Sequence, residues 1–494
     1  MTPSSELFEL IKSLSASEKR HFKLNADLQK GNKNYIRLFK IIDAQKSYDE
    51  KQIKTKFRNE NFVKNLTFTK NYLYKLIFKS LISLYNQKSL DARLNNILSR
   101  CRLMYDKALY SQYFKTLQYG KGLAVKYERF SILLEFLEME RQLSKKEDIT
   151  RKNINDVYDE ELNVLEKIRI NNKYKRSISG LFRIYRLHGI IRNSSAAEQI
   201  NNILRSEEFS IEKKFLSVTA KEKYFFAMNI ASELKGNSRE AYNFNKKRFE
   251  HIFKNKEVFQ QFLFDNYKDS YIALIHSAVQ DLRFAVAKRM FEKFNKTFNS
   301  VGVFNTDTAA TYYIITLSHA VSSENKKIKT FLPDSIEKFL VKNKGKVTIN
   351  QYNYLYYLLA KYFFIIGEFD EALRIINFLF AVKTLKFTIH LEPYARMLNA
   401  LVHYELGNKK LLNYLIPSTV KYLKSKSKLY KTENAVLSSL KKLNNFKTEE
   451  DLLKIFSLLK KNLLVFKKDI YEKNAFVYFD FLKWADNKRI VNSE

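Results

Sequence analysis

The chain is poor in the two residues that interrupt regular structure. Its 494 residues include only ten glycines and four prolines. These residues supply the tight turns of sheet proteins and the long loops of α/β enzymes, so their scarcity argues against both classes. Because 45% of the residues are hydrophobic, there is ample material for a core. The composition therefore predicts an all-α protein whose helices are joined by short turns.

Cysteine is scarcer still, and catalytic motifs are missing. The single cysteine, Cys101, excludes an intramolecular disulfide and a zinc site built from thiolates. The sequence contains no G-x-x-x-x-G-K-[ST] loop, no G-x-G-x-x-G loop and no H-E-x-x-H pair. We therefore expect no enzymatic activity, no metal and no cofactor. The chain begins without the segments of a signal peptide and lacks a long apolar run, so we expect a cytoplasmic protein without a membrane span.

Positive charge, in contrast, is abundant. The chain has 88 basic and 52 acidic residues, which gives a formal net charge of +36, and 66 of the basic residues are lysines. Attraction to nucleic acid or another polyanion is one explanation. AT-rich coding bias is the other, and the excess of lysine over arginine favours it, because recognition of phosphates and bases prefers the planar arginine fork.

The clearest helix pair lies in residues 354–380. It has large residues at core positions, a small residue where the helices cross and a glycine at the turn, at Tyr356, Leu359, Ala360, Phe363, Gly367, Phe369, Ala372, Ile376 and Leu379. A second segment has the same spacing, with Leu282 in place of the glycine, at Tyr271, Leu274, Ala278, Leu282, Phe284, Ala287, Phe291 and Phe294. These segments resemble a degenerate tetratricopeptide repeat (TPR). The chain also resembles TPR-like proteins of the Bacteroidota, a likeness that implies no function.

The spacing of the turns extends this pattern along the chain. The turn positions Gly236, Leu282, Gly367 and Gly407 are separated by 46, 85 and 40 residues, and the middle interval fits two units. The period of about 40 to 46 residues exceeds the 34 of the standard repeat, which indicates longer helices. The resemblance implies a right-handed superhelical α-solenoid of antiparallel helix pairs. We expect an N-terminal helical domain at 1–90, the helix-pair array at 95–420, and basic helices that cap the array at 421–494.

The resemblance also implies which residues line the concave inner face of the superhelix. They belong to the first helix of each pair, at Tyr354, Tyr357, Lys361, Phe364, Asp269, His276, Tyr394 and Tyr404. An aromatic and basic groove of this kind suits an extended peptide or a partner helix. The alternative is that several of these residues pack against adjacent repeats.

Two lysine-rich regions, residues 51–79 and 409–468, are candidates for contact with nucleic acid. Their candidate residues are Lys54, Lys56, Arg58, Lys75, Lys79, Lys424, Lys426 and Lys428. In the first region, short helices before a longer one fit a helix-turn-helix whose last helix enters a major groove. In the second, aromatic residues provide platforms for stacking of single strands. The alternative for both regions is an ordinary helical surface with solvated lysines.

These observations favour a function in binding over one in catalysis. A solenoid exposes an extended surface without a closed catalytic pocket. The leading hypothesis is a non-enzymatic scaffold that binds a protein or peptide partner through a concave aromatic and basic surface. The alternatives are a nucleic-acid-binding protein, and a transcription regulator that couples an N-terminal helix-turn-helix to a TPR-like sensing domain.

Overall fold

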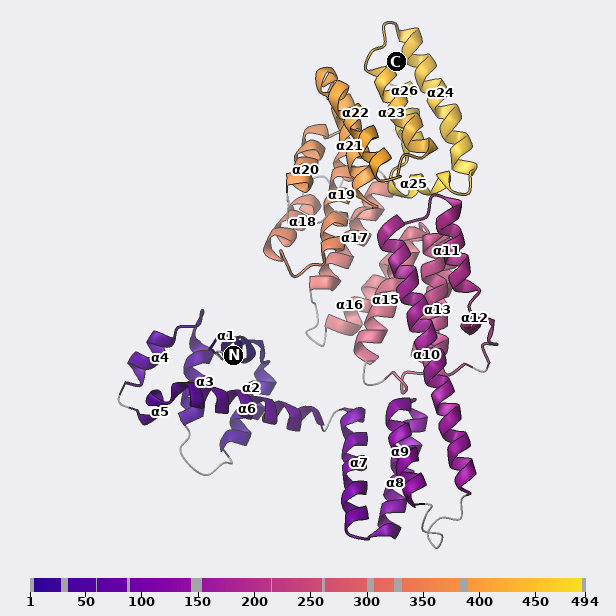
Figure 1. Cartoon of the computed structure of the whole chain (residues 1–494). Helices are drawn as coiled ribbons and strands as arrows, with labels where there is room; N and C mark the ends of the chain where they lie inside the picture. Colours follow the sequence, from indigo (N-terminus) through magenta and orange to yellow (C-terminus); the bar gives the residue numbers. More distant parts are fainter. Residues whose placement is uncertain are drawn as a thin grey trace. The chain divides into compact units, whose positions relative to one another are not determined.

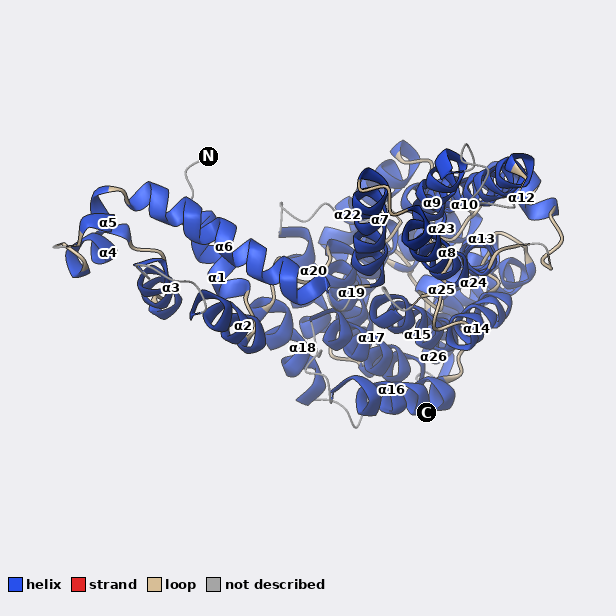
Figure 2. Ribbon diagram, turned by 90° about the horizontal axis from the view of Figure 1, so that it is seen from below, coloured by secondary structure: helices blue, strands red, loops and turns tan. Residues whose placement is uncertain are grey.

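The computed structural model in Figure 1 describes residues 4–27, 34–58, 60–86, 89–143, 153–214, 216–259, 263–299, 306–323, 331–381 and 390–490. All regular structure in these residues is helical, as the composition predicts, and none of them forms a strand (Figure 2). No helix within these ranges is long and apolar enough to cross a membrane. The chain divides into two compact units, unit 1 (Met1–Leu165) and unit 2 (Glu166–Glu494), which we describe separately.

The first helices of unit 1 surround a core of their own. They are α1 (Ser4–Ser13), α2 (Ala16–Asp27), α3 (Asn34–Ala44), α4 (Glu50–Lys56), α5 (Asn61–Lys64) and α6 (Leu66–Asn86). Leu7 and Ile11 lie one turn apart on α1, where both are fully buried in the cluster that includes Ile77 of α6. A reciprocal capping box starts α2: the Glu18 amide donates to Ser15 Oγ at 3.3 Å, and the Ser15 amide donates to the Glu18 carboxylate at 2.7 Å.

Small residues set the close packing in the rest of unit 1. This part consists of α7 (Leu90–Asp106), α8 (Tyr110–Lys126), α9 (Phe130–Leu143) and the first part of α10 (Ile154–His188). Cys101 is fully buried on α7, and Gly120 faces the neighbouring helices from α8. A Cβ atom at Gly120 would lie 2.4 Å from Phe136 Cζ and 2.8 Å from Ile97 Cγ2. Only glycine therefore allows the three helices to approach this closely.

Unit 2 is built largely from consecutive helix pairs. The pairs are α13 (Val218–Leu234) with α14 (Ser238–Lys254), α15 (Leu263–Gln280) with α16 (Phe284–Asn299), α17 (Thr306–Ser323) with α18 (Phe331–Lys342), α19 (Ile349–Ile366) with α20 (Phe369–Ala381), α21 (Glu392–Glu405) with α22 (Lys409–Ser425), and α23 (Lys431–Leu443) with α24 (Glu449–Lys468). The short elements are α11 (Ser194–Leu204), α12 (Glu207–Ser210), η2 (Glu472–Asn474), α25 (Ala475–Tyr478) and α26 (Phe481–Ile490). From α15 to α23, the first helix of each pair contacts the first helix of the next.

The same hydrogen-bonded turn joins helices in both units. One residue of each turn has a left-handed backbone with φ between 50° and 86°: Ala108, Glu128, Gly236, Leu282, Gly367, Gly407 and Ser427. Its amide donates to the carbonyl three residues earlier, and the next amide donates to the carbonyl five residues earlier. This is the Schellman arrangement, which satisfies the last carbonyls of the first helix. The turns predicted at Gly236, Leu282, Gly367 and Gly407 are thereby confirmed.

The last segment of unit 2 returns to its first elements (Figure 1). The Asn474 side chain donates to the Ile191 carbonyl at 2.8 Å, and the Ile190 amide donates to the Tyr478 hydroxyl at 3.3 Å. Gly189, with φ of 64°, lies against the same segment, since a Cβ atom there would lie 2.6 Å from the Tyr478 hydroxyl oxygen. The beginning and end of unit 2 are therefore in direct contact.

Candidate functional site

The predicted inner-face residues of α19 lie together, and most of them contact the chain's own C-terminal segment. The Tyr357 hydroxyl donates to the Tyr478 carbonyl at 3.1 Å, and Lys361 Nζ donates to the same oxygen at 2.7 Å. The Phe364 ring lies edge-on to Phe479, with 5.5 Å between the ring centroids. Tyr357 and Phe364 are consequently buried, whereas Tyr354 at the start of the row is 38% exposed. This face binds a peptide segment, but the segment belongs to the same chain.

The two predicted residues of α21 contact the same segment. The Tyr394 ring stacks on Tyr478 with 4.1 Å between centroids and an interplanar angle of 11°, and the Tyr404 ring lies edge-on to Trp484 at 6.0 Å. Tyr394 is 5% exposed. Tyr394 is therefore not part of an open groove, and Tyr404 is only partly accessible. The expectation of an open aromatic surface at Tyr357, Phe364 and Tyr394 needs correction, because residues 478–484 cover this part of the face.

The two predicted residues of α15 differ in exposure. The Asp269 side chain is exposed, while His276 is partly buried, one residue after the fully buried Ile275. Burial lowers the pKa of His276 to about 4, so its imidazole is neutral at pH 7. The part of the predicted face that remains accessible consists of Asp269 and Tyr354, with His276, Lys361 and Tyr404 partly accessible.

A buried ionic cluster fixes the C-terminal segment to the turn before α11. Arg192 Nη1 donates to Glu433 at 2.6 Å and to the Tyr394 hydroxyl at 2.6 Å, and Arg192 Nη2 donates to Glu472 at 2.7 Å. The Arg192 guanidinium also lies 4.7 Å from the centroid of the Tyr430 ring. The three charged side chains are almost fully buried. Sequence reasoning missed this cluster, because its members are up to 280 residues apart and match no motif.

A cavity of about 610 Å³ lies beside the covered part of the face. Its wall includes residues of α15, α17 and α19 on one side and of η2, α25 and α26 on the other. Leu358 and Phe364 come from α19, while Phe479 and Trp484 come from the C-terminal segment. Tyr354 and Lys361 also line it, and both were predicted from the sequence, as was Phe364. The remaining wall was not predicted, since it depends on where the C-terminal segment returns.

The lysines predicted to contact nucleic acid differ in their surroundings. Among those expected in unit 1, Lys54, Lys56, Arg58, Lys75 and Lys79 are all exposed. In unit 2, Lys424 and Lys426 are exposed, but Lys428 is buried and donates to the Leu187 carbonyl at 3.2 Å. Burial lowers the pKa of Lys428 to about 8. Lys428 is thus a structural contact within unit 2 and is not on the nucleic-acid-facing surface that we expected.

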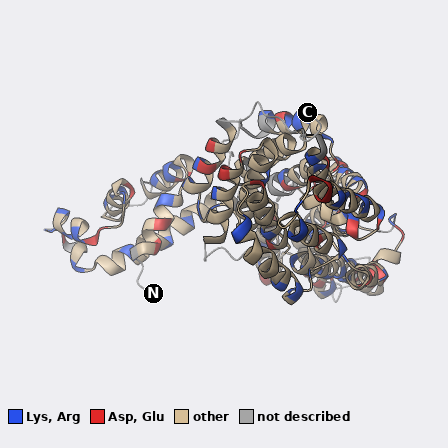
Figure 3. Ribbon diagram, turned by 90° about the horizontal axis from the view of Figure 1, so that it is seen from above, with Lys and Arg blue, Asp and Glu red and all other residues tan. Residues whose placement is uncertain are grey.

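Basic residues are distributed over both units. Figure 3 shows lysine and arginine along helices of each unit, mixed with acidic residues in several places. The helices α6 and α8 of unit 1 include no aspartate or glutamate. Lys75 and Lys79 of α6 are exposed, so α6 presents positive charge to an anionic partner.

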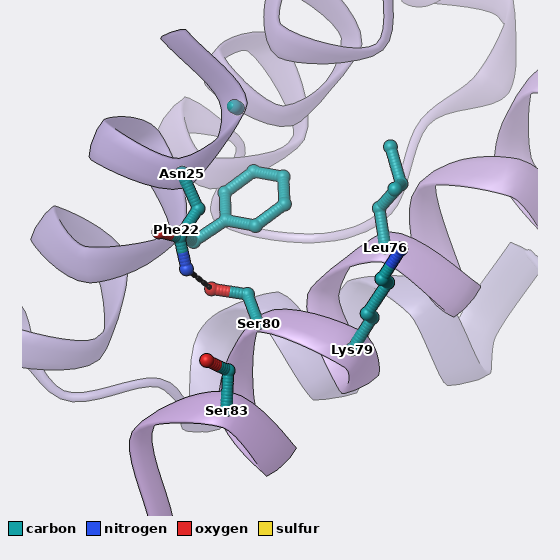
Figure 4. A pocket seen from close by; sticks show the side chains of 7 residues that line it. Phe22, Asn25, Leu76, Lys79, Ser80 and Ser83 are labelled. Atoms are coloured by element: carbon teal, nitrogen blue, oxygen red, sulfur yellow. Dashed lines mark hydrogen bonds between the residues drawn. The ribbon is translucent and has the colours of Figure 1, made fainter. Parts of the chain in front are cut away.

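Unit 1 has a smaller hollow of about 250 Å³ between α2 and α6 (Figure 4). Phe22 and Leu76 form its apolar lining, and Lys79 lies at its side. The Asn25 side chain donates to Ser80 Oγ at 3.2 Å. No pair of groups in this lining has the character of a nucleophile and its base.

Two features of the described residues concern possible catalytic groups. Among them, no group of three or more histidine, cysteine, aspartate or glutamate side chains is placed to hold a metal ion. Cys101 is fully buried, and burial raises the pKa of its thiol to about 11, so thiolate is scarce at neutral pH. Comparison with known proteins gave no matching family model, no matching curated protein and no matching solved structure.

Proposed function

We propose that unit 2 is a TPR-like, right-handed α-solenoid that binds a protein or peptide partner on its inner face without catalysing a reaction. One observation carries this proposal: predicted inner-face residues of α19 already hold a peptide. Tyr357 and Lys361 both donate to the backbone carbonyl of Tyr478, and Phe479 has an extended backbone with φ of −149° and ψ of 132°. Main-chain hydrogen bonds and aromatic-lined grooves are both used by proteins to recognise extended peptides.

The partner binds where this face continues beyond the C-terminal segment. Tyr354 lies one turn before Tyr357 on α19 and is 38% exposed, and Asp269 on α15 is exposed as well. Tyrosine is enriched among the residues that dominate binding energy at interfaces. We therefore place the centre of the contact at Tyr354, with α15 on its border.

Site-specific photo-crosslinking tests this assignment. A photoreactive amino acid replaces Tyr354 in one variant and Tyr414 in another; Tyr414 is a 76% exposed tyrosine on α22. We expect a protein to be captured from cells by the first variant and not by the second. Capture of the same proteins from both positions, or none from position 354, would contradict the proposal.

Binding of nucleic acid by unit 1 is a second candidate. It is favoured by the lack of acidic residues on α6 and by the exposure of Lys75 and Lys79 on that helix. The helix-turn-helix hypothesis assigns α6 to the major groove, with α4 before it. The full chain should then bind duplex DNA with an affinity that falls steeply as salt increases, and Lys75→Glu with Lys79→Glu should abolish binding. Binding that survives this pair of substitutions would reject the assignment to α6.

A further inference from the structure

Apolar side chains form part of the wall of the cavity beside α19. Leu358, Phe364, Phe479 and Trp484 are buried side chains of its wall. Leu282 is 69% exposed and continues the apolar lining at the turn between α15 and α16. Leu282 has φ of 58°, a conformation in which a leucine is about 1 kcal/mol less favourable than a glycine. An apolar side chain is thus presented to the cavity at a position where glycine would fit the backbone better.

Positive charge is in excess on the same wall. Lys361, Lys467, Lys473, Lys483 and Lys488 line the cavity, against the two carboxylates of Glu405 and Asp480. Both carboxylates already have lysine partners, since Glu405 pairs with Lys488 and Asp480 lies 3.8 Å from Lys467. The excess is therefore not neutralised by the acidic residues of the wall.

Lys361 is a partly buried lysine of this wall. Its ammonium donates to the Tyr478 carbonyl, which is a neutral group, and lies 6.0 Å from the centroid of the Phe479 ring. Burial lowers its pKa to about 8, so Lys361 remains mostly protonated at pH 7. The Asp480 carboxylate offsets only part of this effect, so a cation that has lost part of its hydration is stabilised further by an incoming anion.

We propose that this cavity binds an amphiphilic anion, in which an apolar chain or ring carries a carboxylate or phosphate head group. The apolar body packs against Leu358, Phe364, Phe479 and Trp484, and the head group pairs with Lys361 and with Lys473 at the edge. A volume of about 610 Å³ is in the range of small-molecule sites. This site takes a different kind of ligand from the partner surface, although the two share Tyr354.

Bound ligand would contact two parts of unit 2 at once. Lys361 and Leu358 belong to α19, whereas Lys473, Phe479 and Trp484 belong to the C-terminal segment. A ligand that bridges them raises the thermal midpoint of unit 2, because it binds only when the segment is in place. The ligand is thus expected to stabilise the covering of the inner face.

Calorimetric titration of the full chain with four defined probes tests the proposal. Dodecanoate and dodecyl phosphate have both halves of the ligand, dodecanol has only the apolar chain, and acetate has only the charge. At least one of the first two should bind about tenfold or more tightly than dodecanol, with acetate undetectable. The tighter head group identifies the source as a carboxylic acid or a phosphate ester. Equal affinity for dodecanol and the two anions would overturn the proposal.

Matched variants locate the binding. Lys361→Met and Ser322→Trp, the latter placed to fill the cavity from α17, should each weaken binding of the better probe by about tenfold or more, while Lys361→Arg should retain most of it. Lys468→Gln is the control, because Lys468 is exposed and does not line the cavity. If Lys361→Met lowers the thermal midpoint in the absence of probe, Lys473→Gln replaces it. Binding that is the same in all variants would also overturn the proposal, because it would reflect surfactant adsorption.

Discussion

At the scale of single residues, the left-handed turn position makes different demands on different side chains. Gly367 lies in open space, so only its φ of 86° requires glycine. Gly236 has φ of 73° and also approaches Asn474, since a Cβ atom would lie 2.0 Å from Asn474 Oδ1. The same turn is formed elsewhere by Ala108 and Leu282, which accept the strain. The turns with glycine at this position can therefore be recognised from the residue type, whereas those with alanine or leucine cannot.

Alanine substitutions separate these two requirements. Gly367→Ala should destabilise unit 2 by about 1 kcal/mol, because alanine is strained in the left-handed region. Gly236→Ala should cost more, because Asn474 must also move and its bond to the Ile191 carbonyl is lost. Thermal unfolding followed by circular dichroism should give the lower midpoint for Gly236→Ala. Equal midpoints would show that the contact with Asn474 is unimportant.

Two histidines should make unit 2 sensitive to acid. Burial lowers the pKa of His276 and of His390 to about 4, below the ordinary value near 6.5. The unfolded chain therefore binds more protons between pH 6.5 and 4, and stability is lost as the pH falls through that range. His390→Gln should reduce this loss in the free energy of unfolding by on the order of 1 kcal/mol. Melting points from pH 7 to pH 4 check this, with exposed His319→Gln as the control; an unchanged slope for His390→Gln would refute it.

Turn residues also show where sequence reasoning works. Leu282 was placed in a turn because the repeat register required one there, although leucine itself is no turn signal. Glu128 and Ser427 form the same turn and were not assigned to it, since neither glycine nor a strong repeat match marked them. The backbone geometry is determined by the helices on either side more than by the residue in the turn.

At the scale of elements, charged side chains bring together segments that are distant in the sequence. Arg192, in the turn before α11, bonds to Glu433 on α23 and to Glu472 at the start of η2. Glu472 also accepts from the Thr432 amide at 3.0 Å and from its hydroxyl at 2.7 Å. Such a contact is invisible to periodicity, because the hydrophobic pattern of each helix is satisfied without it. The covering of the inner face by residues 478–484 was unpredicted for the same reason.

Replacement of Arg192 should strongly reduce the free energy of unfolding of unit 2. Arg192→Met leaves Glu433 and Glu472 buried without a cationic partner, which is expected to cost about 3 to 5 kcal/mol. Arg205→Met is the control, because Arg205 forms an exposed pair with Glu198 and should cost about 1 kcal/mol or less. Chemical denaturation of unit 2 in the full chain compares the two. Similar losses for both variants would show that the buried cluster does not hold the segment.

At the scale of the whole molecule, composition predicted more than motifs did. The scarcity of glycine and proline predicted an all-helical chain, and the structure confirms this prediction in the residues that it describes. Division into compact units falls at Leu165, whereas the sequence had suggested regions of 1–90, 95–420 and 421–494. No linker marks residue 165, because it lies within α10. The arrangement of the helix pairs as a solenoid, and the partner that it binds, remain proposals.

The central claim is that a partner binds to the accessible end of the inner face, at Tyr354. Its most direct test is the dissociation constant of the partner captured by crosslinking, measured with purified full-length chains. For an interface centred on a tyrosine, Tyr354→Ala should raise the dissociation constant by at least about thirtyfold. Tyr414→Ala, on the surface of α22, should leave it unchanged. Equal dissociation constants for the two variants would contradict the account.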